Sequence, residues 1–139
     1  MTYDPDNIFA KIIRGELPCF KVYEDDFTLA FMDINPQTKG HTLVVSKTAG
    51  IDLLDTEDDD LAAAIKTTRK VARAIDKVLT PDGIMIAQLN RSAAGQTVYH
   101  THFHIMPRWQ GIELKLHNTI PAEMSEIEAL AQKIATEIE

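Results

Sequence analysis

The feature that most constrains this chain is a run of three histidines at alternating positions, His100, His102 and His104. On an α-helix, side chains two positions apart point to different faces, whereas on a β-strand every second side chain points to the same face. The residues between and beside these histidines are mainly β-branched or aromatic, and such residues favour strands. We therefore predict a strand over about residues 97–106 with one face made of imidazoles.

The opposite face of this predicted strand carries Tyr99, Phe103 and Ile105, which we expect to point into a hydrophobic core. Imidazoles on one face lie roughly 7 Å apart along a strand, so two of them can meet one small anion or metal ion. Three ionisable side chains in a row are more than a purely structural strand requires. The residues alone therefore indicate either a metal site or a nucleophile directed at phosphorus.

Composition narrows the class of protein. A length of 139 residues, with 45% hydrophobic and 25% charged residues, is typical of one globular domain with a proper core. The net charge of −7 argues against a broad nucleic-acid-binding surface. Cys19 is the only cysteine, which fits a reducing compartment. With no signal-like N-terminus and no apolar stretch of membrane-spanning length, we expect a cytoplasmic protein without a membrane partner.

Hydrophobic periodicity and turn residues predict the other elements. A first helix is expected to start with Asp4 as its cap and Pro5 at its first position, and to end at Gly15. Its apolar stripe consists of Ile8, Phe9, Ile12 and Ile13. Two short apolar runs within residues 20–32 predict a hairpin, and residues 41–46 predict a third strand.

In the second half, residues 56–59 resemble a capping box and predict a long helix over about residues 57–79. Its expected buried stripe is Leu61, Ile65, Ala72, Ile75 and Leu79. A fourth strand over residues 83–90 is expected to pair with the histidine strand, and a final helix is expected to end near residue 138. Hairpins separated by helices predict an α+β fold with an antiparallel sheet of about five strands.

The loop before the histidines supplies groups that suit a phosphate. Gly95 lets the backbone approach a ligand closely, and Gln96 and Thr97 offer donors. A neutral imidazole beside such a loop is a competent nucleophile toward phosphorus. Taken by themselves, Asp33 fits a turn as well as a ligand site, and His41 fits a structural role.

Several segments together resemble the histidine triad (HIT) superfamily, in particular its Hint (histidine triad nucleotide-binding) branch. Residues 100–106 match the signature His-φ-His-φ-His-φ-φ, where φ is apolar, with Thr101 as the one φ position that carries a hydroxyl. Further similar segments are residues 7–13, 23–25, 31–37, 40–45 and 94–99. The resemblance implies a single HIT domain over residues 1–139, with its core at about 5–108 and a bacterial-type C-terminal extension at about 109–139.

The resemblance also implies roles for individual residues. His102 matches the nucleophile that attacks the α-phosphorus, and His104 matches a phosphate-contacting residue. His100 and His41 match histidines that orient and tune the nucleophile, and Asp33 matches an acceptor for the ribose hydroxyls. The remaining matches are the phosphate-side donors Asn90, Gly95, Gln96 and Thr97, and the base-side residues Ile8, Phe9, Ile12, Phe31, Ile34 and Leu43.

The activity that the resemblance implies is hydrolysis of a nucleoside 5′-phosphoramidate, or of a related nucleotidyl bond, to the nucleoside monophosphate. The expected protein is a homodimer that binds a purine (AMP-like) nucleotide and needs no cofactor. Some bacterial members hold zinc at positions that match Asn7, Ala10 and Ala49, and none of these three side chains is a usual zinc ligand. We therefore expect no metal.

Three other functions are compatible with the sequence. The first is cleavage of dinucleoside polyphosphates, as in the Fhit branch. The second is a nucleotide-binding or interaction module whose hydrolysis is incidental, and the third is a metal enzyme that uses the three histidines as ligands. Turnover of a phosphoramidate compared with a diadenosine polyphosphate, in the presence of a chelator, separates these possibilities.

Overall fold

The protein folds as an α+β structure in the computed structural model, which describes residues 1–115 and 119–139. The sheet is antiparallel and consists of β1 (Lys21–Glu24), β2 (Thr28–Met32), β3 (Thr42–Ser46), β4 (Gly83–Ala87) and β5 (His102–Arg108). The helices are α1 (Ile8–Ile13), α2 (Asp58–Leu79) and α3 (Met124–Glu137), with a 3-10 turn, η1, at Ser92–Ala94. This arrangement confirms the predicted fold class. No helix in the described part of the chain is long and apolar enough to cross a membrane.

The strand order in the sheet is β1-β2-β3-β5-β4, so the histidine strand β5 lies between β3 and the edge strand β4. The register pairs Val45 of β3 with His102, and it pairs His104 with Leu43 of β3 and Ala87 of β4. His104 is therefore flanked by an apolar and a small side chain in the two neighbouring strands, whereas His102 is paired on the β3 side only.

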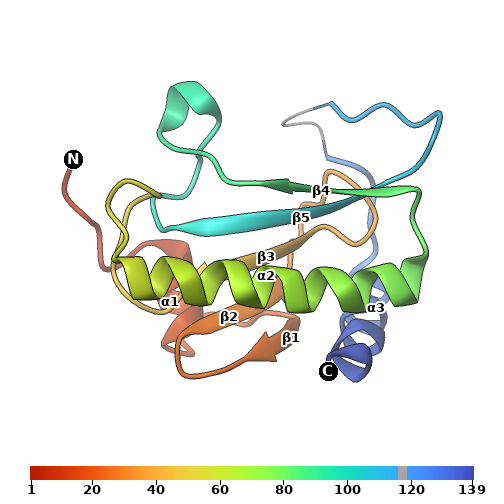
Figure 1. The fold of residues 1–139 in the computed structure, drawn as a ribbon, viewed down its shortest axis with the longest axis horizontal. Helices are drawn as coiled ribbons and strands as arrows, with labels where there is room; N and C mark the ends of the chain where they lie inside the picture. Colours follow the sequence, from red (N-terminus) through yellow and green to blue (C-terminus); the bar gives the residue numbers. More distant parts are fainter. Residues whose placement is uncertain (116–118) are drawn as a thin grey trace.

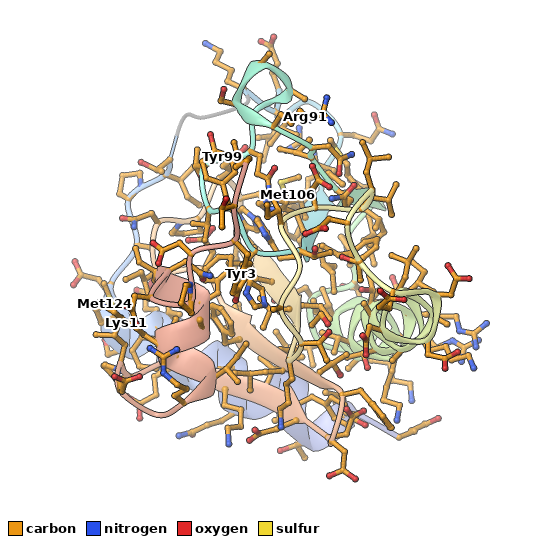
Figure 2. All side chains as sticks on the ribbon, turned by 90° about the vertical axis from the view of Figure 1, so that its left-hand side faces the viewer. Tyr3, Lys11, Arg91, Tyr99, Met106 and Met124 are labelled. Carbon is orange, nitrogen blue, oxygen red and sulfur yellow. The ribbon has the colours of Figure 1, made fainter. Side chains whose placement is uncertain are left out.

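Helices cover both faces of the sheet. Figure 1 shows α2 in front of the sheet, running nearly along the direction of β4 and β5, and Figure 2 shows α1 and α2 on opposite sides of the sheet. One face packs against α2 and α3 in a cluster that includes Val44, Ile75, Phe103, Ile105 and Ile134. The other face packs against α1 in a smaller cluster of Phe9, Leu29, Phe31, Leu43 and Val45. Because neighbouring residues on a strand alternate between faces, His102 and His104 share the α1 face.

The histidine strand is shorter than predicted. β5 begins at His102, and residues 98–100 form a bend instead of pairing with β3. Phe103 and Ile105 lie in the core as expected, whereas Tyr99 is half-buried and outside the core clusters. The fourth strand also ends early, at Ala87. The bend allows the chain before β5 to turn His100 away from the row formed by the other two histidines.

Both predicted helix caps are wrong. The side chain of Asn7, rather than Asp4, accepts a hydrogen bond from the backbone N–H of Ala10 at 2.9 Å, and α1 starts at Ile8, three residues after the predicted Pro5. Asp4 instead forms a local turn by accepting from the backbone N–H of Asp6. At α2 the Thr56 hydroxyl donates to the carbonyl of Asp52 and pairs with the Thr101 hydroxyl, so it does not cap the helix.

The buried face of α2 is rotated from the predicted stripe. Four of the five predicted residues are buried or pack against the core, but Ile65 is 47% exposed. The face that meets the sheet is centred on Ala64, Val71 and Ile75. Small side chains such as Ala64 let the helix approach the sheet closely, and that packing, rather than the number of large apolar residues, selects the face.

Candidate active site

A cavity of about 390 Å³ lies between α1 and the face of the sheet that carries His102 and His104. Its size falls within the usual range for small-molecule sites. Eleven of the residues predicted for a nucleotide site line it together: Ile8, Phe9, Ile12, Phe31, Asp33, Ile34, Leu43, Gly95, Thr97, His102 and His104. The fold thus brings the expected base-side, ribose-side and phosphate-side residues to one cavity, although they come from segments far apart in the sequence.

The protonation of His102 follows from its hydrogen bond. Its Nδ1 lies 2.6 Å from the backbone carbonyl oxygen of His100. A carbonyl oxygen only accepts, so Nδ1 must carry the proton and donate it. The other ring nitrogen, Nε2, then holds a lone pair. Since the His102 ring lines the cavity, this lone pair is the group that the site offers as a nucleophile.

A chain of hydrogen bonds makes His104 a hydrogen-bond donor toward the cavity, in contrast to His102. The backbone N–H of Gln37 donates to Nδ1 of His41 at 3.1 Å, so the proton of His41 lies on Nε2. That nitrogen donates to Nδ1 of His104 at 2.9 Å. The proton of His104 must therefore lie on its own Nε2. The cavity wall contains one imidazole with a free lone pair, His102, and one imidazole N–H donor, His104.

Burial keeps these imidazoles neutral. Loss of hydration on burial, reinforced by a neighbouring histidine in each case, lowers the pKa of His41, His102 and His104 from the usual 6.5 to about 4. Burial also lowers the pKa of His100. The histidines are therefore uncharged at neutral pH, and the site does not present a row of positive charges.

Asp33 lies beside His41, which belongs to the same hydrogen-bond network. Burial raises the pKa of its carboxyl group, while a hydrogen bond from the backbone N–H of Asn35 opposes this rise. Its Oδ2 lies 3.6 Å from Nδ1 of His41. This contact is not an ion pair, because His41 is neutral and its Nδ1 already accepts from Gln37. Asp33 lines the cavity, and its Oδ1 accepts the bond from Asn35 at 2.8 Å.

The loop between β4 and β5 divides its residues between cavity and scaffold. Gly95 and Thr97 line the cavity. Gln96 is only 3% exposed and does not line it: its side-chain oxygen accepts from the N–H of Arg91 at 2.6 Å, and its amide nitrogen donates to the carbonyl of Ile51 at 2.6 Å. Its backbone N–H also donates, to the carbonyl of Arg91. This arrangement makes Gln96 a brace of the loop, and its role as a phosphate-side donor stays a prediction.

Asn90 also lies beside the cavity rather than in its wall. Its Oδ1 accepts from the backbone N–H of Leu53 and from the amide of Gln88, each at 2.9 Å. These bonds use the oxygen of the side chain and fix the orientation of its amide. The NH₂ group, which only donates, is left to bond elsewhere. Asn90 therefore has the chemistry of a phosphate-side donor, with a position set by the 50–56 loop.

The structure adds residues that the sequence patterns did not indicate. The hydroxyl of Tyr3 lies 2.8 Å from Nδ1 of His100, a contact between residues 97 positions apart. Thr119 of the C-terminal segment lines the cavity, and the N–H of Ile120 next to it donates to the carbonyl of Pro36 at 2.8 Å. Neither contact belongs to a regular element with a periodic pattern, so no signal in the sequence alone could have found them.

The hydrogen bonds argue against the three histidines as a set of metal ligands. Both ring nitrogens of His100 are occupied, one by Tyr3 and the other by the carbonyl oxygen of Ser46 at 2.6 Å. His102 and His104 each have one nitrogen occupied. Across residues 1–115 and 119–139, the structure contains no group of three or more His, Cys, Asp and Glu side chains placed to hold a metal ion. At the position that matches a zinc ligand in some bacterial proteins, Asn7 caps α1.

Comparison with known proteins shows similarity along nearly the whole chain. Residues 14–111 match the HIT domain family model. An uncharacterized HIT-like protein of Borreliella burgdorferi is 41% identical over 96% of this chain and 99% of its own length. Adenosine 5′-monophosphoramidase hnt1 of Schizosaccharomyces pombe is 36% identical over 94% of this chain and 97% of its own. The crystal structure of a Hit-like protein involved in cell-cycle regulation from Bartonella henselae superposes with a TM-score of 0.93 at 47% identity, covering 99% of this chain and 100% of the other.

Proposed function

The chain belongs to the HIT domain family, and from that premise we propose that it is a nucleotide-binding hydrolase that cleaves nucleoside 5′-phosphoramidates or related nucleotidyl bonds to a nucleoside monophosphate. The observation that carries the proposal is the hydrogen bond from Nδ1–H of His102 to the carbonyl of His100, which leaves Nε2 unprotonated in the cavity wall. The monophosphoramidase activity in the name of the S. pombe relative supports the same reaction class.

The cavity suits an AMP-like purine nucleotide. Its apolar part includes Phe9, Phe31 and Leu43, which are each less than 10% exposed and offer a surface for a flat base. Asp33 offers acceptor oxygens to the two ribose hydroxyls. The α-phosphate then lies beside His102 and His104, with the Gly95–Thr97 loop on its far side. The ribose and phosphate contacts are therefore polar, and the base contact is mainly apolar.

The chemistry proceeds in two displacements at phosphorus. Nε2 of His102 attacks the α-phosphorus, the bond from phosphorus to the leaving amine breaks, and the amine departs with a proton taken from water. The Nε2–H of His104 donates to an equatorial phosphate oxygen as charge spreads over these oxygens in the transition state. Water then attacks the nucleotidyl-histidine and gives its proton to the hydroxide left by the first step. The bond from phosphorus to Nε2 breaks, the monophosphate leaves, and the neutral His102 is restored.

The surroundings of His102 favour this route. When Nε2 bonds to phosphorus, the imidazole ring becomes cationic, and the carbonyl of His100 on its Nδ1–H stabilises that charge. The lowered pKa of His102 keeps the ring unprotonated, and therefore nucleophilic, over the whole range above about pH 4. No metal ion is needed, since the imidazole supplies the nucleophile and His104 supplies the donor.

We also propose that the protein forms a homodimer through the groove between α2 and β4. This groove is lined by apolar side chains that include Ile65 and Ile86, which are 47% and 43% exposed, together with Arg69 and Asp76. β4 is an edge of the sheet, and an uncovered edge beside apolar groups favours pairing with another chain. A separate proposal concerns the domain organisation: residues 1–139 form one domain. It is supported by Ile134 of α3, which packs into the core cluster shared by α2 and the sheet.

The test compares wild-type protein with His102→Ala on a fluorogenic adenosine 5′-phosphoramidate and on a diadenosine polyphosphate, both with chelator present. We expect turnover of the phosphoramidate by the wild type only, and AMP binding by both proteins in calorimetry. Mass spectrometry of acid-quenched wild type should show one added nucleotidyl group. Retained turnover by His102→Ala would exclude the nucleophile assignment, and preference for the polyphosphate would replace the proposed substrate class.

A further inference from the structure

Tyr3 is tied to the histidine row although it lies outside the cavity. Its hydroxyl is 2.8 Å from Nδ1 of His100, and the two rings lie 5.7 Å apart between their centroids. Tyr3 is half-buried and is not among the residues of the cavity wall. Figure 2 shows it on the N-terminal segment that leads into α1. Tyr3 therefore contacts the histidines at His100 and does not touch the cavity itself.

The hydrogen bonds around His100 fix the direction of this contact. Nε2 of His100 lies 2.6 Å from the carbonyl oxygen of Ser46, so that nitrogen carries the proton and donates it. A neutral ring with its proton on Nε2 has a lone pair on Nδ1. The Tyr3 hydroxyl is therefore the donor. The His100 ring is thus held at both of its nitrogens, by the hydroxyl of Tyr3 and by the carbonyl of Ser46.

His100 passes this constraint to His102 through the backbone. The carbonyl oxygen of His100 accepts the proton of His102 Nδ1 at 2.6 Å. His100 lies in the bend before β5, and its carbonyl belongs to the same planar peptide unit as the N–H of Thr101, which donates to the carbonyl of Gly50 at 2.9 Å. Phe9 packs edge-on against both rings, with its centroid 6.4 Å from His100 and 4.8 Å from His102. The ring contacts of His100 thus add to this backbone bond in holding the acceptor for the His102 proton.

We propose that Tyr3 is a positioning residue for the reaction: by donating to Nδ1 of His100 it helps to hold the carbonyl of His100 on Nδ1–H of His102. This inference rests on the proposed function of His102 as nucleophile. The carbonyl must stay in place as the His102 ring becomes cationic during attack, so the hydroxyl of Tyr3 contributes to turnover rather than to nucleotide affinity. The proposed network contains Tyr3, the ring of His100, its carbonyl and His102.

The first test is Tyr3→Phe, which removes only the hydroxyl. Loss of one hydrogen bond of ordinary strength predicts a decrease in kcat of about three- to tenfold, because each 1.4 kcal/mol is a factor of ten in rate. KM for the phosphoramidate should stay within about twofold, as Tyr3 does not line the cavity. The matched control is Tyr23→Phe: Tyr23 also donates from a half-buried position, to Asp25 at 2.8 Å, but far from the histidines. It should leave kcat unchanged.

A double-mutant cycle separates positioning from simple anchoring of the N-terminal segment. In a His100→Ala background, Tyr3→Phe should have no further effect on kcat, since the acceptor of the hydroxyl is gone. If His100→Ala does not fold, His100→Phe serves as the background. An equal decrease in both backgrounds, or an unchanged kcat in Tyr3→Phe, would overturn the inference.

Nitrogen NMR of the histidine rings tests the inference independently of turnover. In Tyr3→Phe, the Nδ1 signal of His100 should shift toward that of an unbonded lone pair, and the Nδ1–H signal of His102 should shift with it. A shift confined to His100 would overturn the inference even if the wild type is active. Failure of the wild type to hydrolyse any nucleotide would instead overturn the proposed function, and the shift at His102 would still decide whether Tyr3 positions that ring.

Discussion

The two faces of the sheet are both covered by helices, yet one is solid and the other holds a cavity. On the solid face, α2 and α3, with 22 and 14 residues, span the strands and bury a continuous apolar cluster. On the other face, α1 has only 6 residues, and its Phe9 packs in a cluster with Leu29, Phe31, Leu43 and Val45. A helix of this length cannot cover five strands. The uncovered part of the face becomes the cavity, and the histidines that would otherwise be fully enclosed line its wall.

The titratable groups follow the same division. The buried polar groups between the sheet and α2 are hydroxyls, such as those of Thr28 and Thr67, which bond to each other at 2.7 Å. The groups that titrate, His41, His102, His104 and Asp33, lie on the α1 side or at its rim. The comparison teaches that stability and chemistry are assigned to different faces. The following predictions test that division, beginning with the largest expected effect.

The largest effect is expected on the cavity face, at His102. Replacement by Ala removes the nucleophile, so kcat should fall by at least about 10³-fold, which corresponds to about 4 kcal/mol in the barrier. The protein should still fold, because the truncation only enlarges an existing cavity. Steady-state kinetics and AMP calorimetry on the same preparation measure both properties. If His102→Ala lost both AMP binding and the folded state, the two faces of the sheet would not be separable.

The next effect is expected on the solid face, at Ile134 of α3, which is fully buried. Ile134→Ala should lower the free energy of unfolding by about 2–5 kcal/mol, since it leaves a void in a closely packed core. The kcat of the remaining folded protein should be unchanged. Denaturant unfolding measures this, with exposed Glu128→Ala of the same helix as the control. A tenfold fall in kcat at full folding would contradict the division.

The pH dependence of stability should come from the cavity face. The pKa values of His41, His102 and His104 are about 4 in the folded protein and near 6.5 in the unfolded chain. Between these values the unfolded chain binds more protons, so stability is fully present above about pH 6.5 and is lost as the pH falls toward 4. The raised pKa of Asp33 acts in the opposite direction, but it is one group against three.

Thermal unfolding between pH 7 and pH 4.5 checks this expectation. The melting temperature should fall across the range in the wild type, and the slope should be shallower in His102→Gln, which has one fewer titrating group. Ile134→Ala should lower the whole curve without changing its slope. A melting temperature that is flat from pH 7 to pH 4.5 would show that the histidines are not held neutral by burial.

The smallest effect is expected at Ile12, a half-buried residue that lines the cavity from α1. Ile12→Ala should lower the free energy of unfolding by less than about 1.5 kcal/mol, below the range for a fully buried site. It should raise KM by a few fold through lost contact with the base, and leave kcat unchanged. Kinetics and denaturant unfolding on one preparation measure this. A stability loss as large as that of Ile134→Ala would mean that α1 is part of the main core.

Residue patterns were informative wherever a periodic element was long or the chemistry was local. The alternation at residues 100–104 predicted a strand and a shared imidazole face, and the structure confirms the strand from His102. The long helix was predicted to within about one residue at each end. Errors occurred where two groups competed for one partner: Asn7 rather than Asp4 caps α1, and Thr56 bonds to the chain before β5 instead of capping α2.

The sequence by itself determined the strand and helix types, the α+β class and the family, because periodicity and a dense histidine motif are local properties of the chain. Only the tertiary structure decided which nitrogen of each imidazole carries a proton, that Gln96 braces a loop, and that Tyr3 reaches His100. These facts depend on which backbone carbonyl or hydroxyl arrives beside a side chain after packing. A partner 97 residues away has no local pattern, and it is specified only when the sheet and α1 have closed around the cavity.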